Sequence, residues 1–283
     1  NIMILFNDLP GNGWDNLHTR ACEAFESDGS PNRSIKWQLY GSDLNEAFAQ
    51  PSSVHLTVSF SALHWIDHLP FDQSGVSNGA ICYVDLPRTQ KDQLRRHKDA
   101  RLKDFILKRK RELVPGGQMV LVFDGETANR EHQYYQPTRL LQQSIQSMVA
   151  KKSLSEEVLS NFFVMTSSWS APRIQQCCQQ TNMNLHHLSV RVVPCPMYDN
   201  FLLSPQKAED RNKFGDQVAD AILSCVRPQL AKIIKTVGES GDKVDETIHA
   251  IHKRVAHLAA ETPASSNTSG TVAFVHVTKP NAS

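Results

Sequence analysis

Short apolar runs bounded by turn residues alternate along the chain with longer segments in which apolar residues recur every three or four positions. Runs of the first kind predict buried strands, and segments of the second kind predict amphipathic helices. The predicted strands are residues 2–6, 35–40, 54–60, 118–123, 184–193 and 271–277, and 81–84 is either a short strand or the end of a loop. The predicted helices are residues 14–25, 88–111, 136–152, 154–162, 172–181 and 206–260, the last broken at 238–241. A helix that crosses over between strands predicts an α/β fold with a parallel sheet.

The first strand runs directly into the turn sequence Asn7-Asp8-Leu9-Pro10-Gly11-Asn12. Pro10-Gly11 is the pair that a type II turn prefers, so Asp8 is expected at the carboxyl end of the strand. Ligands bind at that end in open α/β sheets, and an acidic residue there can accept both hydroxyls of a nucleotide ribose. The alternative is that Asp8 only caps the turn.

His64 and Trp65 follow the strand predicted at 54–60, at the same edge of the sheet. Imidazole and indole N–H groups are both donors, and two donors that converge on a carboxylate would hold it in one orientation. The alternative is a core histidine that bonds to a backbone carbonyl. Asp124 also follows a predicted strand, but its place before Gly125 favours a turn residue over a catalytic acid.

Composition narrows the class of protein. A chain of 283 residues, of which 40% are hydrophobic and 21% charged, can bury a sizeable core. The net charge of +1 gives no global field toward nucleic acid or an acidic membrane. The six cysteines have no zinc-site spacing, which favours reduced thiols and a cytoplasmic location. No apolar run approaches the roughly 20 residues of a membrane helix.

Four stretches carry a family resemblance. They are the turn 7–12, residues 59–70 with Leu63-His64-Trp65-Ile66 and Pro70, residues 112–121 (Glu-Leu-Val-Pro-Gly-Gly-Gln-Met-Val-Leu), and residues 156–162. In this order and spacing the chain resembles the SABATH family of S-adenosylmethionine-dependent carboxyl methyltransferases. The resemblance implies a Rossmann-like class I methyltransferase sheet with a helical cap. It places the core at 1–130 and 183–283, with 206–262 partly cap helices, and the cap at 131–182.

The resemblance also implies roles on the cofactor side for S-adenosylmethionine. Asp8 would hold the ribose and Leu9 the adenine. Gln38 and Leu39 take the place of residues that contact the adenine side, although the family's serine is not kept. Ser61 falls where the family often has a tyrosine between cofactor and substrate.

On the substrate side the resemblance makes His64 and Trp65 the residues that grip a carboxylate, and it places Trp169 near a substrate-lining aromatic position. A metal ligand of some family members precedes a Ser-Phe pair. This chain has Ser160 and Asn161 there, so a Mg²⁺ site is open but unsupported by the ligand positions.

One expectation concerns what precedes Asp8. The family has an additional strand, with an acidic residue and a Gly-rich turn, before the strand that ends in Asp8. The sequence starts at Asn1 without it. Because that strand would be central, its absence would leave two exposed sheet edges and an opened core. We therefore expect either a truncated fragment or a protein with reduced cofactor binding.

Three functions follow. The first is methylation of the carboxyl group of a small molecule, or of a ring nitrogen as in the purine-alkaloid branch of the family. The second is a binding or regulatory module that keeps the fold without catalysis. The third is nucleic-acid binding through the basic helix at 88–111, which ranks last because acidic residues interrupt the basic run. The oligomeric state stays open between a monomer and a homodimer.

Overall fold

The structure is a computed structural model. It describes residues 2–8, 35–41, 46–47, 49–60, 62–66, 68–72, 80–127, 135–166, 168–238, 241–266 and 270–281, with the backbone alone for 2–8 and 35–41. The predicted helix at 14–25 lies outside these residues, as do Leu9 and Ser61.

Most of the predicted strands are confirmed. The strands are β1 (Ile2–Asp8), β2 (Ile35–Gly41), β3 (Val54–Phe60), β4 (Leu113–Glu126), β5 (Trp169–Ser170), β6 (Asn184–Val193) and β7 (Gly270–Thr278). In the larger sheet the order is β3-β4-β7-β6, and β5 pairs with the end of β4. β3 is parallel to β4, whereas β7 runs antiparallel between β4 and β6.

The helices also follow the predicted pattern. They are α2 (Arg88–Glu112), α3 (Tyr135–Ala150), α4 (Glu156–Asn161), α5 (Ala171–Gln180), α6 (Pro196–Leu203), α7 (Ala208–Thr236) and α8 (Gly241–Glu261), with short 3-10 helices η3 (Tyr83–Asp85) and η4 (Pro263–Ser266). Ser155 caps α4, because its side chain accepts a hydrogen bond from the Glu157 backbone N–H.

β1 and β2 form a second, separate sheet. They pair in parallel over their full lengths, so that Asp8 lies opposite Gly41. Among the described residues neither strand is hydrogen-bonded to β3. Leu56, Val58 and Phe60 of β3 are 54%, 46% and 65% exposed, although they are large and apolar. These three residues alternate along β3, so they lie on one face of the strand, and this face is largely uncovered.

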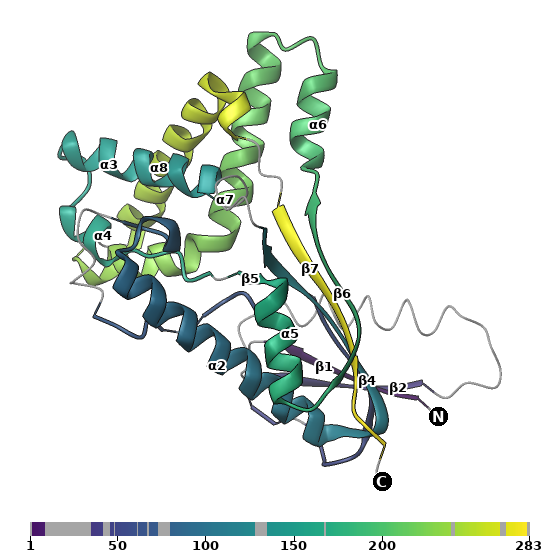
Figure 1. Cartoon of the computed structure of the whole chain (residues 1–283). Helices are drawn as coiled ribbons and strands as arrows, with labels where there is room; N and C mark the ends of the chain where they lie inside the picture. The colour runs from purple at the N-terminus through teal and green to yellow at the C-terminus, as the bar shows by residue number, and fades with distance from the viewer. Residues whose placement is uncertain are drawn as a thin grey trace.

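The two larger of the three apolar clusters among the described residues belong to different groups of elements. One joins α2 and α5 to β4 and β7, through residues such as Phe105, Ile174 and Val275. The other joins α3, α4, α6, α7 and α8. Figure 1 shows this helical group at the end of the sheet where β4 and β6 finish. The described part of the fold therefore presents the carboxyl ends of its parallel strands toward the helices.

The structure decides one open prediction, corrects a second and adds one helix. Of the two alternatives for residues 81–84, the strand is excluded, because the chain makes a 3-10 turn at Tyr83–Asp85. β4 does not end at Phe123, because Asp124 pairs with Val272 of β7 and the strand continues to Glu126. Helix α6 was not predicted, since its eight residues between two prolines show too little periodicity. The predicted domain limits of 1–130, 131–182 and 183–283 stay a prediction.

Candidate functional site

A tight turn after β3 carries His64 and Trp65. The Trp65 N–H donates to the Ala62 carbonyl (3.2 Å), and the Ile66 N–H donates to the Met165 carbonyl (3.0 Å). Trp65 also forms an isolated antiparallel bridge with Thr166. Because Leu63 and Ile66 on either side are buried, the turn is anchored at both ends and presents its two aromatic side chains in a defined orientation.

His64 points inward from this turn. His64 is only 7% exposed, and Asp124 is 6% exposed. The His64 Nδ1 lies 3.7 Å from Oδ1 of Asp124. The interpretation of Asp124 as a turn residue is therefore wrong: it is a strand residue whose carboxylate faces the candidate site. The sequence signal for a site role of Asp124 was its place directly after the strand predicted at 118–123. Its pairing with Val272 could not be predicted, because Val272 is distant in the sequence.

Burial sets the charge of His64. It lowers the pKa of the imidazole from 6.5 to about 4, because water no longer stabilises the charged form. The ring is therefore neutral at pH 7 and carries a single N–H. A proton on Nδ1 would face Asp124, whereas a proton on Nε2 would be available to a bound carboxylate. His64 can thus act as one donor at most, and not as a cation.

Trp65 faces a pocket of about 610 Å³ between the turn and helices α4 and α7. This volume is in the range of small-molecule sites. The walls include Trp65, Ile66, Met165, Pro228, Gln229 and Lys232. His64 and Trp65 have ring centroids 5.2 Å apart, tilted by 41°, so the histidine lies beside the wall that the indole presents. The pocket combines apolar surface with one cationic side chain, Lys232, and one acidic side chain, Glu157.

The predicted cofactor residues lie at the ends of the smaller sheet. Asp8 is the last residue of β1, and Gln38 and Leu39 lie near the end of β2. Asp8 lies opposite Gly41 where these two parallel strands end, and this is the edge at which ligands bind in open α/β sheets. The contacts of Asp8, Gln38 and Leu39 with S-adenosylmethionine stay predictions.

Trp169 is 2% exposed and is not among the residues that line the pocket beside Trp65. Its ring packs edge-on against Phe123 at 5.2 Å, and its backbone pairs with Gly125. The structure thus places Trp169 behind the end of β4. Its predicted role as a substrate contact stays a prediction.

Among the described residues, no three His, Cys, Asp or Glu side chains are grouped so that they could hold a metal ion. None of the helices in the described part of the chain is both long and apolar enough to cross a lipid bilayer.

The sheet order, with β7 antiparallel between β4 and β6, defines the class of fold: the Rossmann-like fold of class I S-adenosylmethionine-dependent methyltransferases. A solved structure, loganic acid methyltransferase with S-adenosylhomocysteine, is similar with a TM-score of 0.71. The similarity covers 99% of this chain and 74% of that chain, at 17% sequence identity.

The family follows from the sequence. The family model described as SAM dependent carboxyl methyltransferase matches residues 1–280, and the chain belongs to this family. Anthranilate O-methyltransferase 1 from Zea mays is 26% identical over 282 residues, which span 92% of this chain and 70% of that protein. An inactive anthranilate O-methyltransferase 1 from the same species matches equally well. Gibberellic acid methyltransferase 2 from Arabidopsis thaliana is 25% identical over 170 residues, or 56% of this chain and 43% of that protein.

Proposed function

We propose that this chain transfers a methyl group to the carboxylate of a small organic acid, with the acid held at the His64–Trp65 turn and the cofactor nucleoside at the end of β1. The observation that carries the proposal is the turn itself: a buried, neutral His64 lies beside Trp65, whose indole faces a pocket of ligand size. Asp8, Leu9, Gln38, Leu39 and Ser61 are the proposed cofactor contacts.

The reaction needs little acid–base chemistry from the protein. A carboxylic acid has a reference pKa near 4, so at pH 7 the acceptor is already a nucleophile. S-adenosylmethionine supplies an electrophilic methyl group on a sulfonium. The protein must hold the acceptor oxygen in line and exclude water, and such positioning can supply about 7–11 kcal/mol of barrier reduction.

The residues near the turn suit this task. The indole of Trp65 can only donate, so it can orient one carboxylate oxygen without competing for the methyl group. His64 can donate to the second oxygen when its proton is on Nε2. Apolar walls at Ile66, Met165 and Pro228 would hold an apolar acid and displace water from the pocket. Lys232, on the same wall as Pro228, would attract the acid, and Glu157 on the α4 wall would oppose this attraction.

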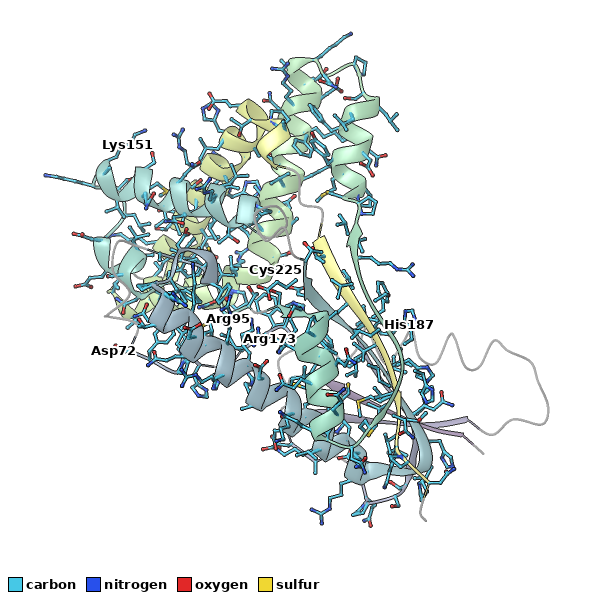
Figure 2. The ribbon with its side chains drawn as sticks, viewed as in Figure 1. Asp72, Arg95, Lys151, Arg173, His187 and Cys225 are labelled. Atoms are coloured by element: carbon cyan, nitrogen blue, oxygen red, sulfur yellow. The ribbon has the colours of Figure 1, made fainter. Side chains whose placement is uncertain are left out.

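Substitutions at the turn test the proposal. His64→Ala and Trp65→Phe each remove a donor, and Trp65→Phe keeps an aromatic ring. We expect ester formation to fall at least 100-fold in both variants, while the affinity for S-adenosylhomocysteine changes less than twofold. Methyl-ester product and calorimetry give the two measurements. His187→Ala, a surface substitution on β6 (Figure 2), is the matched control.

An equal loss of ester formation and cofactor affinity in the two turn variants would contradict these roles. Asp8→Asn gives the complementary test, because it should weaken S-adenosylhomocysteine binding. If the unmodified chain binds no S-adenosylhomocysteine at millimolar concentration, the second candidate, a binding or regulatory module with the methyltransferase fold, is favoured. The observation that favours this second candidate is that β1, which ends in Asp8, pairs only with β2 among the described strands.

The compartment belongs to this proposal as well. All described cysteines, namely Cys82, Cys177, Cys178, Cys195 and Cys225, are free thiols. Free thiols support a reducing compartment, and we propose the cytoplasm.

A further inference from the structure

Lys98 is a buried lysine that the proposed chemistry does not use. It lies in the middle of α2 and is 1% exposed, although lysine is almost never fully buried. It is one helical turn from Leu94 and one from Leu102, so the three side chains form a stripe along one face of α2. Leu94 and Leu102 are both buried, and this face therefore packs inward.

Two aromatic rings flank the Lys98 ammonium group. Its Nζ lies 4.9 Å from the centroid of the Tyr83 ring and 5.5 Å from the Trp169 ring. Both distances are within the range of cation–π attraction, which strengthens when water is excluded. Lys98 therefore ties α2 to the 3-10 turn at Tyr83 on one side and to β5 on the other.

The same rings lead to the candidate site. Trp169 pairs with Gly125 and packs on Phe123, the two neighbours of Asp124 in β4. Asp124 lies 3.7 Å from His64. Leu63, just before His64, shares an apolar cluster with Leu102, and Ile66 shares another with Leu94. The two residues that flank Lys98 on its face of α2 therefore share apolar clusters with the two residues that flank the His64–Trp65 pair.

The charge on Lys98 responds to pH near neutrality. Burial, and then the positive charge of Arg173, lower its pKa from 10.5 to about 7. Glu126 and Asp99 oppose this shift, and Arg95 adds to it. Arg173 is fixed by Asp99 (2.6 Å) and by the Arg95 carbonyl (2.9 Å), and Figure 2 shows both arginines where α2 meets α5. These four charged groups act on the ammonium group electrostatically, and the two rings lie against it.

We propose that Lys98 is a positioning residue for methyl transfer, whose protonated side chain holds Trp169 and the end of β4 so that Asp124 and His64 keep the acceptor geometry. This inference rests on the proposed function of the His64–Trp65 turn. Loss of the proton removes the attraction to both rings, and the support for the turn weakens.

The test compares the pH dependence of the unmodified chain with that of Lys98→Met, which keeps the length of the side chain and removes its charge. For the unmodified chain we expect kcat/KM for the acceptor to fall about tenfold between pH 6 and pH 8, because the protonated fraction falls by that factor. For Lys98→Met we expect a low, flat profile with unchanged cofactor affinity. Lys108→Met, at a half-buried position of the same helix where the lysine pairs with Asp104, should keep the wild-type profile.

Tyr83→Leu is the second variant, in case Lys98→Met does not fold. It removes one ring from the ammonium group, so the fall in kcat/KM should move to lower pH, whereas Tyr83→Phe should not move it. A wild-type profile in folded Lys98→Met, or no displacement in Tyr83→Leu, would overturn the proposal.

A second measurement separates this proposal from the proposed function. Trp65 fluorescence, taken as the difference between chains with and without Trp65→Phe, should change through about pH 7 in the unmodified chain and not in Lys98→Met. If the chain transfers no methyl group but shows this transition, the proposed function fails and the link from Lys98 to the turn stands. If it transfers methyl groups and the transition survives Lys98→Met, only the positioning role fails.

Discussion

Arg109 and Glu112 form a buried ion pair at the end of α2. Arg109 is 0% and Glu112 1% exposed, and their side chains are joined at 3.0 Å. Arg109 also donates to the Glu46 carbonyl, and the Ala49 N–H donates to Glu112. The pair thus fastens the segment before β3 to the end of α2, which sets where β3 begins.

Glu112→Ala should lower the free energy of unfolding by about 3–5 kcal/mol, because it leaves the Arg109 charge buried without its partner. Urea denaturation at pH 7 measures the change. The double variant Arg109→Met with Glu112→Leu should recover most of the loss, since it removes both charges. Equal instability of the single and double variants would show that packing, and not the charge, dominates.

Helix packing depends on close backbone approach at one position. Gly215 of α7 faces α8, and a Cβ atom there would lie 2.2 Å from the Ala256 carbonyl oxygen. A side chain would force the two longest cap helices apart.

Gly215→Ala should therefore destabilise the protein by about 1–3 kcal/mol, although alanine is better than glycine in a helix by about 1 kcal/mol. The midpoint of urea denaturation shows whether the net change in stability is a loss or a gain. Ser224→Ala, at an exposed position of the same helix, is the control and should change stability little. A stabilised Gly215→Ala chain would mean that α8 can move at little cost.

The accuracy with which the sequence predicts the ends of an element also differs between elements. β6 matches its prediction at both ends, because its turn residues and alternation are local signals. The end of β4 was placed too early, because Asp124-Gly125 has turn chemistry and only the pairing with β7 keeps it extended. At the site, the sequence pointed to His64 and Trp65. It could not reveal Lys98, because a lysine in a basic helix gives no local sign of burial.

At the scale of the whole molecule, the two sheets differ in how many strands are hydrogen-bonded together. β1 and β2 pair only with each other among the described strands, whereas β4 is hydrogen-bonded on both edges. A two-stranded sheet by itself is marginally stable in water. The proposed cofactor residue Asp8 is on the less supported sheet.

Hydrogen exchange should show this difference. We expect backbone amides of β1 and β2 to exchange at least 100-fold faster than those of β4 and β7, because local opening costs less there. S-adenosylhomocysteine should slow exchange in β1 and β2 selectively, since a ligand stabilises the elements that it binds. Uniform protection of both sheets would contradict the expected difference, and protection elsewhere would place the cofactor on other residues.

The position of β7 has a consequence for how the protein is made. β7 (residues 270–278) lies between β4 and β6, so these two earlier strands are not hydrogen-bonded to each other in the described sheet. During synthesis on the ribosome, β4 and β6 therefore cannot be joined in one sheet until β7 has been translated. A premature stop codon anywhere before residue 270 would therefore divide the sheet, however much of the cap had already been translated.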